Sequence, residues 1–167
     1  MKTIKLLSLL FLVFAQYAAF SQVEKYMAAF TYQICKATTW PAQSDNFVIG
    51  VIGQSDIIPF FEKMSEEKKI GAQSIKVVAS NNVDEVSDCQ VVFISKEKTA
   101  QLDHISKALA NKPILIITES SDILVKGANL NFTVVDNKIR YSLNKTDLTS
   151  RNLIVHSTIE RMALKVY

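Results

Sequence analysis

The sequence contains few glycines, prolines, cysteines and histidines, and each shortage narrows the kind of protein it can encode. Its 167 residues include only 4 glycines and 3 prolines, with no repeat, low-complexity tract or linker, which indicates one compact unit. The 19 basic and 16 acidic residues nearly balance, and no basic cluster extends beyond Lys68-Lys69. Nucleic acid and anionic membrane surfaces are therefore poor candidates as partners.

The sequence also lacks the residue combinations that usually carry catalysis. No nucleophile with a base, metal cluster or carboxylate pair is recognisable. His104 falls on the solvated face of a predicted helix and His156 within the last predicted helix, and neither has a second ligand at metal-binding spacing. The segment Gly50 to Ser55 superficially resembles a phosphate-binding loop but lacks its Lys-Ser/Thr ending. We therefore predict a protein that is not an enzyme and uses no cofactor or metal.

The first 21 residues are typical of an export signal. Lys2 and Lys5 precede an apolar run from Leu6 to Ala15 that only Ser8 interrupts, and small residues follow. The run is shorter than the roughly 20 apolar residues that a membrane span needs. An uncleaved anchor or a buried first helix is the alternative.

We predict cleavage before Gln22, which leaves residues 22–167 as a single domain in the periplasm. The two lysines of the signal are then lost, so the formal charge falls from +3 to +1. Outside the cytoplasm nucleoside triphosphates are scarce and thiols tend to oxidise, which makes a kinase or a Rossmann-type enzyme a poor hypothesis.

Helical and strand patterns alternate through the first two thirds of this domain. Apolar residues recur at helical spacing in three segments, and short continuous apolar runs typical of strands covered on both faces lie between them. Ser95 is placed to cap the third helix. The predicted helices cover residues 24–39, 56–68 and 96–110, and the predicted strands cover residues 47–52, 75–79, 90–94 and 113–117.

The alternation of helical and strand patterns ends after residue 129. The segments Leu130 to Val135 and Lys138 to Leu143 read as strands joined by Asp136-Asn137, a dipeptide suited to a tight hairpin. Apolar residues then form one helical stripe from Thr146 to Val166. The predicted fold is an α/β three-layer sandwich whose mixed sheet has parallel early strands and a C-terminal antiparallel hairpin, followed by a long C-terminal helix.

Several motifs in this order resemble the YfiR-like family of exported bacterial regulators. They begin with a helix that ends in Trp-Pro, and they include a glycine turn and an Arg-aromatic-X-aliphatic-Asn strand. Together they cover nearly all of residues 22–167. The motifs are Phe30 to Pro41, Phe47 to Gly53, Asp88 to Ser95, Pro113 to Thr118, Gly127 to Phe132 and Lys138 to Asn144.

The resemblance implies a periplasmic, non-enzymatic protein that is often a homodimer. The best-known member restrains an inner-membrane diguanylate cyclase by binding its periplasmic part. This chain departs from the family pattern between Ser150 and Ser157 and has one glycine, Gly127, where the family commonly has two. We therefore expect control of an inner-membrane signalling protein, either a cyclase of cyclic-di-GMP signalling or a sensor kinase. A small-ligand carrier is the alternative, and a small hydrolase is a third hypothesis.

Four residues are candidates for a disulfide or for partner recognition. Cys35 and Cys89 can form the single intramolecular disulfide or remain two separate buried thiols. Strand alternation places Arg140 and Asn144 on one polar face of the last strand, where they can recognise a partner. The structural alternative is that Arg140 pairs with a carboxylate or a helix end and that Asn144 caps the last helix.

Any small ligand would bind where the parallel strands end, because connections diverge there. The polar residues at these ends are also suited to solvated loops and helix caps, which is the alternative reading. The candidates for a ligand cleft are Gln54, Ser55, Ser95, Glu119, Ser120 and Ser121.

Overall fold

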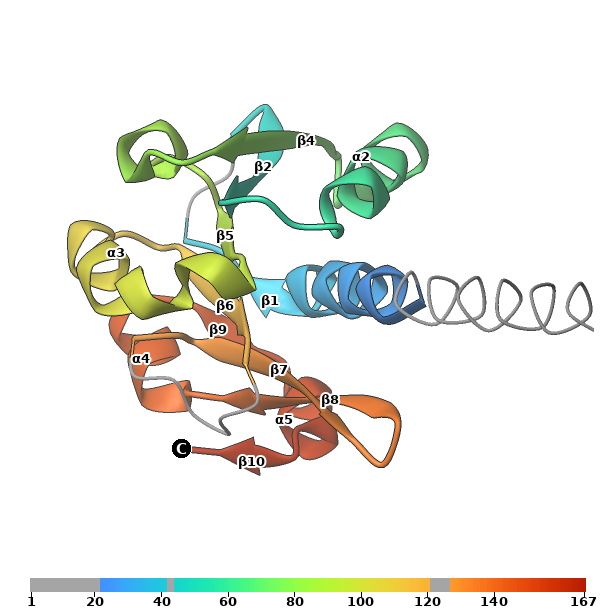
Figure 1. The fold of residues 1–167 in the computed structure, drawn as a ribbon. Coiled ribbons are helices and arrows are strands. Elements are labelled where there is room, and N and C mark those ends of the chain that lie inside the picture. The colour runs from blue at the N-terminus through green and yellow to red at the C-terminus, as the bar shows by residue number, and fades with distance from the viewer. Residues whose placement is uncertain (1–21, 42–43, 121–126) are drawn as a thin grey trace, which may run out of the picture.

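The computed structural model describes residues 22–41, 44–120 and 127–167 and contains a curled mixed sheet with helices packed against it (Figure 1). The predicted signal peptide and Ser121 lie outside these described residues. The strand order is β10-β8-β7-β6-β5-β2-β4-β3. The strands are β2 (Asn46–Ile52), β3 (Lys69–Ile70), β4 (Gln73–Ser80), β5 (Val91–Ile94), β6 (Leu115–Glu119), β7 (Leu130–Val135), β8 (Lys138–Leu143) and β10 (Lys165–Val166).

The direction of the strands confirms the predicted mixed sheet. β4, β2, β5, β6 and β7 are parallel to one another, whereas β8 pairs antiparallel with β7. The hairpin joins Leu130–Val135 to Lys138–Leu143 through Asp136 and Asn137, whose φ angles of 50° and 57° are those of a tight turn with two left-handed residues. The turn chemistry therefore fixes the register of the last two long strands.

Helices lie on both faces of the sheet and enclose two apolar cores. A helix over residues 22–36, α2 (Ile58–Glu67), α4 (Lys145–Ser150) and α5 (Ser157–Met162) contribute to the larger core. The short 3-10 helix η1 (Val83–Val86) and α3 (Leu102–Ala108) cover the smaller core. Alternate residues of the central strands point to opposite cores, as expected for strands buried on both faces.

The segment predicted as one helix over residues 96–110 has two parts. It begins as the 3-10 helix η2 (Lys96–Gln101) and continues as α3. Ser95 occupies the N-cap position, but its side chain makes no capping hydrogen bond, and its buried Oγ has no partner among the described residues. The prediction of a helix here was correct in place, whereas the capping role of Ser95 was wrong.

The predicted long C-terminal helix is wrong. α4 ends at Ser150, and Asn152, two residues later, has a left-handed φ of 60°. The Leu153 N–H donates to the Leu148 carbonyl at 2.9 Å, as in a Schellman motif. The chain then forms β9 (Ile154–Val155), which pairs antiparallel with β1 (Thr38–Thr39). His156 Nδ1 accepts a hydrogen bond from the Thr158 N–H at 3.2 Å and caps α5.

A polar network joins α4 to the sheet and to the end of α3. Asn129 is fully buried, and its Oδ1 accepts from the Ile116 N–H at 2.7 Å while its Nδ2 donates to Asp147. Arg151, only 5% exposed, donates from Nε to Asp147 Oδ2 at 3.0 Å and from Nη1 to the Leu109 carbonyl at 2.9 Å. The network satisfies polar groups that would otherwise be costly to bury.

Replacing Arg151 with Met is therefore expected to destabilise the fold. The substitution leaves the partly exposed Asp147 without its cation and the buried Leu109 carbonyl without this donor, and the loss of such partners costs about 2 kcal/mol. Urea unfolding measures the change. The control is Lys107→Ala, which breaks an ion pair with Asp103 whose side chains are 76% and 67% exposed, and it should cost less than about 0.5 kcal/mol. Equal effects of the two substitutions would contradict the role of the network.

Candidate functional site

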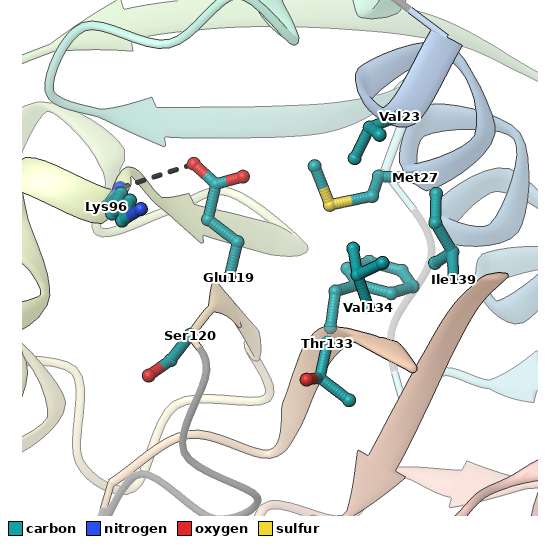
Figure 2. A pocket seen from close by; sticks show the side chains of 9 residues that line it. Val23, Met27, Lys96, Glu119, Ser120, Thr133, Val134 and Ile139 are labelled. Carbon is teal, nitrogen blue, oxygen red and sulfur yellow. Dashed lines mark hydrogen bonds between the residues drawn. The ribbon is translucent and has the colours of Figure 1, made fainter. Parts of the chain in front are cut away.

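A cavity of about 280 Å³ lies beside the carboxyl end of β6, between the helix over residues 22–36 and the β7–β8 hairpin (Figure 2). Parallel strands β5 and β6 deliver Lys96 and Glu119 to this end of the sheet, as the strand-end hypothesis requires. One side of the cavity is polar and the other is apolar. The polar residues are Lys96, Glu119, Ser120 and Thr133, and the apolar ones are Val23, Met27, Phe132, Val134 and Ile139.

Glu119 is the acidic group of the cavity. Its Oε1 accepts a hydrogen bond from the Lys96 N–H at 3.3 Å, and Figure 2 shows its other carboxylate oxygen directed toward the side of Met27. Burial raises the pKa of Glu119 most, and the hydrogen bond from the Lys96 N–H lowers it. The negative charge of Glu24 raises it, the positive charge of Lys96 lowers it, and the charge of Asp56 raises it by the smallest amount. The cavity therefore holds a carboxyl group that resists ionisation in the absence of a compensating cation.

Glu24 is a second carboxyl group whose charge acts on Glu119. Burial is also the main cause that raises its pKa, a hydrogen bond from its own backbone lowers this pKa, and the charge of Asp56 raises it. Its Oε2 is buried and has no hydrogen-bond partner among the described residues. Glu24, Asp56 and Glu119 thus give this end of the sheet a negative potential.

The structure divides the predicted ligand cleft. Glu119 and Ser120 line the cavity, whereas Gln54, Ser55 and Ser95 do not. The ends of β2 and β5 approach too closely to leave a cleft, since a Cβ on Gly53 would lie 2.2 Å from Ser95 Oγ. The same Cβ would lie 2.6 Å from Lys98 Cγ and 2.9 Å from Glu97 Oε1, so these side chains also fill the gap.

The contacts at the ends of β2 and β5 have structural roles. The Gln54 N–H donates to Glu97 Oε1 at 3.0 Å, and Ser55 Oγ accepts from the Ile57 N–H at 3.4 Å. For Gln54 and Ser55 the alternative of loop and cap residues therefore describes the structure better. The space for a ligand lies instead at the end of β6, the strand next to β5.

A wider groove of about 820 Å³ continues from the cavity across the surface, and we call it the helix–hairpin groove. It shares the side chains of Val23, Val134 and Ile139 with the cavity. Its apolar surface is open to solvent, because Tyr26 is 54% exposed and Val134 is 56% exposed. The remaining residues of the groove are Gln22, Phe30, Asn137, Lys138 and Arg140.

Arg140 and Asn144, the predicted recognition residues, have different environments. Arg140 is exposed on β8, lines the helix–hairpin groove and makes no ion pair with the residues that the structure describes. Asn144 instead caps α4, and its Oδ1 accepts from the Asp147 N–H at 3.0 Å. Asn144 therefore follows its structural alternative, whereas Arg140 is available for contact.

The predicted disulfide is absent, and the alternative of two separate buried thiols describes the structure. Cys35 belongs to the larger core and Cys89 to the smaller core, on the opposite face of the sheet. Burial raises the pKa of Cys35 well above its usual range, and burial with the charge of Asp88 raises the pKa of Cys89 to about 11. Both thiols therefore behave as apolar core groups.

The described ranges contain neither a metal-binding cluster nor a membrane-spanning helix. No group of three or more His, Cys, Asp and Glu side chains is arranged there to hold a metal ion. No helix in the same ranges has both the length and the apolar character to cross a membrane.

The site thus consists of an open apolar groove beside a cavity that is polar on one side, both on a mixed α/β sheet. The sequence pattern of the YfiR/HmsC-like family matches residues 24–163, so the chain belongs to that family. Comparison with curated proteins gives no match. The family is known for regulation in the periplasm rather than for catalysis. Its match confirms the resemblance drawn from the sequence motifs.

The free energy of unfolding is expected to fall less with rising pH in a Glu119→Gln variant than in the native protein. The pKa of Glu119 is raised in the folded protein, which therefore binds the proton more tightly than the unfolded chain, where the value is 4.5. Stability falls as pH rises from 4.5 through the raised value, and the penalty remains at higher pH. The urea midpoint of the variant should exceed that of the native protein at pH 7.

The difference between the two proteins should vanish once the pH lies below the unfolded value, because both side chains are then neutral. Glu66 is an exposed glutamate on α2, so Glu66→Gln is the matched control for the loss of one negative charge. A variant that gains more stability at acidic than at neutral pH would contradict the raised pKa.

Proposed function

We propose that the protein is an exported regulator that binds the periplasmic part of an inner-membrane signalling protein and controls its activity. A diguanylate cyclase and a sensor kinase are the two candidate partners. Membership of the YfiR/HmsC-like family supports the regulatory class and the periplasmic location. The predicted signal peptide over residues 1–21 would deliver the chain to that compartment. Dimer formation, which the family resemblance implies, stays a prediction.

The helix–hairpin groove is the observation that carries the proposal. Tyr26 and Val134 expose apolar surface to water in this groove. Such exposure does not stabilise a monomer, and it is typical of interaction sites. Tyr and Arg are the residue types that dominate the energetics of many protein interfaces, and Tyr26 and Arg140 lie in the same groove. The groove therefore suits a protein segment as its occupant.

The charge of the groove indicates the chemistry of that segment. Lys138 and Arg140 both line it and are exposed. An apolar segment of the partner flanked by a carboxylate would match the apolar floor and the basic border together. Regulation further requires two states of the complex that differ in affinity, since a signal can shift a switch only by differential binding.

A small-ligand binding module is the second candidate function. The cavity beside Glu119 supports it, because this cavity lies at the predicted strand end and combines an apolar wall with polar groups. The two functions are compatible, since a regulator needs a signal as well as a partner.

A photocrosslinking amino acid at position 134 tests the regulatory proposal. In living cells it is expected to capture an inner-membrane cyclase or sensor kinase, and Arg140→Glu should reduce the adduct at least tenfold by reversing the charge at the border of the groove. The signalling output of the captured protein should change in the Arg140→Glu strain as it does in a strain that lacks the regulator.

Lys76→Glu is the matched control, because Lys76 is an exposed basic residue on β4, near the far edge of the same sheet, and the change in net charge is the same. It should leave the adduct intact. Equal loss with both variants, or no loss with Arg140→Glu, would contradict binding through the groove. A copurified metabolite without any protein adduct would favour the carrier.

A further inference from the structure

We propose that the cavity beside Glu119 binds a small organic cation, a molecule with an ammonium group on a short apolar body. The proposal deepens the proposed function, on which it rests for its regulatory meaning, because it names the chemical class of the signal. The binding itself depends only on the cavity. It is therefore measurable on the protein without any partner.

The apolar wall of the cavity selects the body of the ligand. Met27 and Phe132 are almost fully buried and come from the helix over residues 22–36 and from β7, and Val23 and Ile139 pack at its sides. A volume of about 280 Å³ admits a small molecule and is too small for a folded protein segment. Burial of an alkyl chain against this wall is favourable because it removes apolar surface from water.

The polar end of the cavity selects a positive charge. Glu119 is held by the Lys96 N–H through one oxygen, and Figure 2 shows the other oxygen facing the cavity. Glu24 has a buried oxygen without a partner among the described residues, and its charge and that of Asp56 both act on Glu119. An ammonium group would supply a charge-assisted hydrogen bond to the Glu119 carboxylate, the acidic group that lines the cavity, and the charges of Glu24 and Asp56 would add attraction at longer range.

Lys96 is the cation that faces this acidic end, and its exposure limits its effect. The positive charge of its exposed side chain lowers the pKa of Glu119 less than the charge of Glu24 raises it, although the Lys96 N–H lowers this pKa more than Glu24 raises it. No ion pair within 4.0 Å joins Lys96 to Glu119 or to another carboxylate in the described part of the chain. The balance of charge at the cavity therefore remains negative, so the site attracts a cation and repels a carboxylate.

The position of the cavity gives its ligand a route to regulation. Val23, Val134 and Ile139 form walls of both the cavity and the helix–hairpin groove. A ligand that fixes these side chains changes the surface presented to the partner. Ligand and partner binding are then coupled, and the coupling is reciprocal.

Calorimetric titration with three six-carbon probes tests the proposal on protein purified from the periplasm. Hexylamine carries the positive charge, 1-hexanol has the same body without charge, and hexanoate has the opposite charge. Hexylamine is expected to bind at least tenfold more tightly than 1-hexanol, and hexanoate should not bind. Glu119→Gln should reduce hexylamine affinity at least tenfold and leave 1-hexanol affinity unchanged.

Glu97→Gln is the matched control, since Glu97 lies in the neighbouring segment, bonds to the Gln54 N–H and does not line the cavity. Its affinity for hexylamine should equal that of the native protein, and thermal unfolding checks that both variants fold. Absence of hexylamine binding at millimolar concentration, hexanoate binding of equal strength, or insensitivity to Glu119→Gln would each overturn the proposal. None of these outcomes affects the Arg140-dependent crosslink, so a failure here is distinct from a failure of the proposed function.

Discussion

Contact among three aromatic rings holds the N-terminal helix against the hairpin, and both proposed binding surfaces depend on it. Phe30 of the helix lies 6.5 Å from Phe132 and 6.2 Å from Tyr141, measured between ring centroids, and the two hairpin rings lie 6.3 Å apart. Tilted and edge-to-face rings at such separations attract beyond their burial of area. Phe30 lines the helix–hairpin groove and Phe132 lines the cavity, so one contact shapes both sites.

The rest of the fold keeps this arrangement rigid. Tyr141 donates its hydroxyl hydrogen to the Ile159 carbonyl at 2.7 Å, which ties the hairpin to α5, and its burial raises its pKa to about 12. The Asn129, Asp147 and Arg151 network fixes α4 at the opposite end of the same strands. The hairpin therefore presents its exposed side from a firmly supported base. A preorganised surface of this kind binds a partner without a large cost of ordering.

The sequence predicted the elements whose signals are local. The Asp136-Asn137 turn and the alternation on either side of it gave the hairpin with the correct strand bounds, and the apolar runs gave the parallel strands. The prediction of one long C-terminal helix was wrong because the apolar stripe in the sequence continues across the point where the helix ends. Leu148, Val155 and Ile159 are all buried, but Asn152 adopts a left-handed conformation and His156 begins a new helix. A stripe of apolar residues alone does not indicate where a helix ends.

The candidate site was predicted only in part, for a similar reason. The polar residues at the strand ends are visible in the sequence, and Glu119 and Ser120 do line the cavity. Its apolar wall comes from segments more than a hundred residues apart, Val23 and Phe132, and no local pattern joins them. The closed gap between Gly53 and Ser95 likewise depends on tertiary contact. Only the folded arrangement shows where space remains.

Hydrogen exchange of native protein and of Phe30→Ala tests most directly whether the aromatic contact creates the binding surfaces. Faster exchange is expected in the amides of residues 22–36 and of the hairpin, with β2 and β5 unchanged, because only the helix–hairpin contact is weakened. A uniform increase throughout the sheet, or no change in the helix and hairpin, would contradict the account.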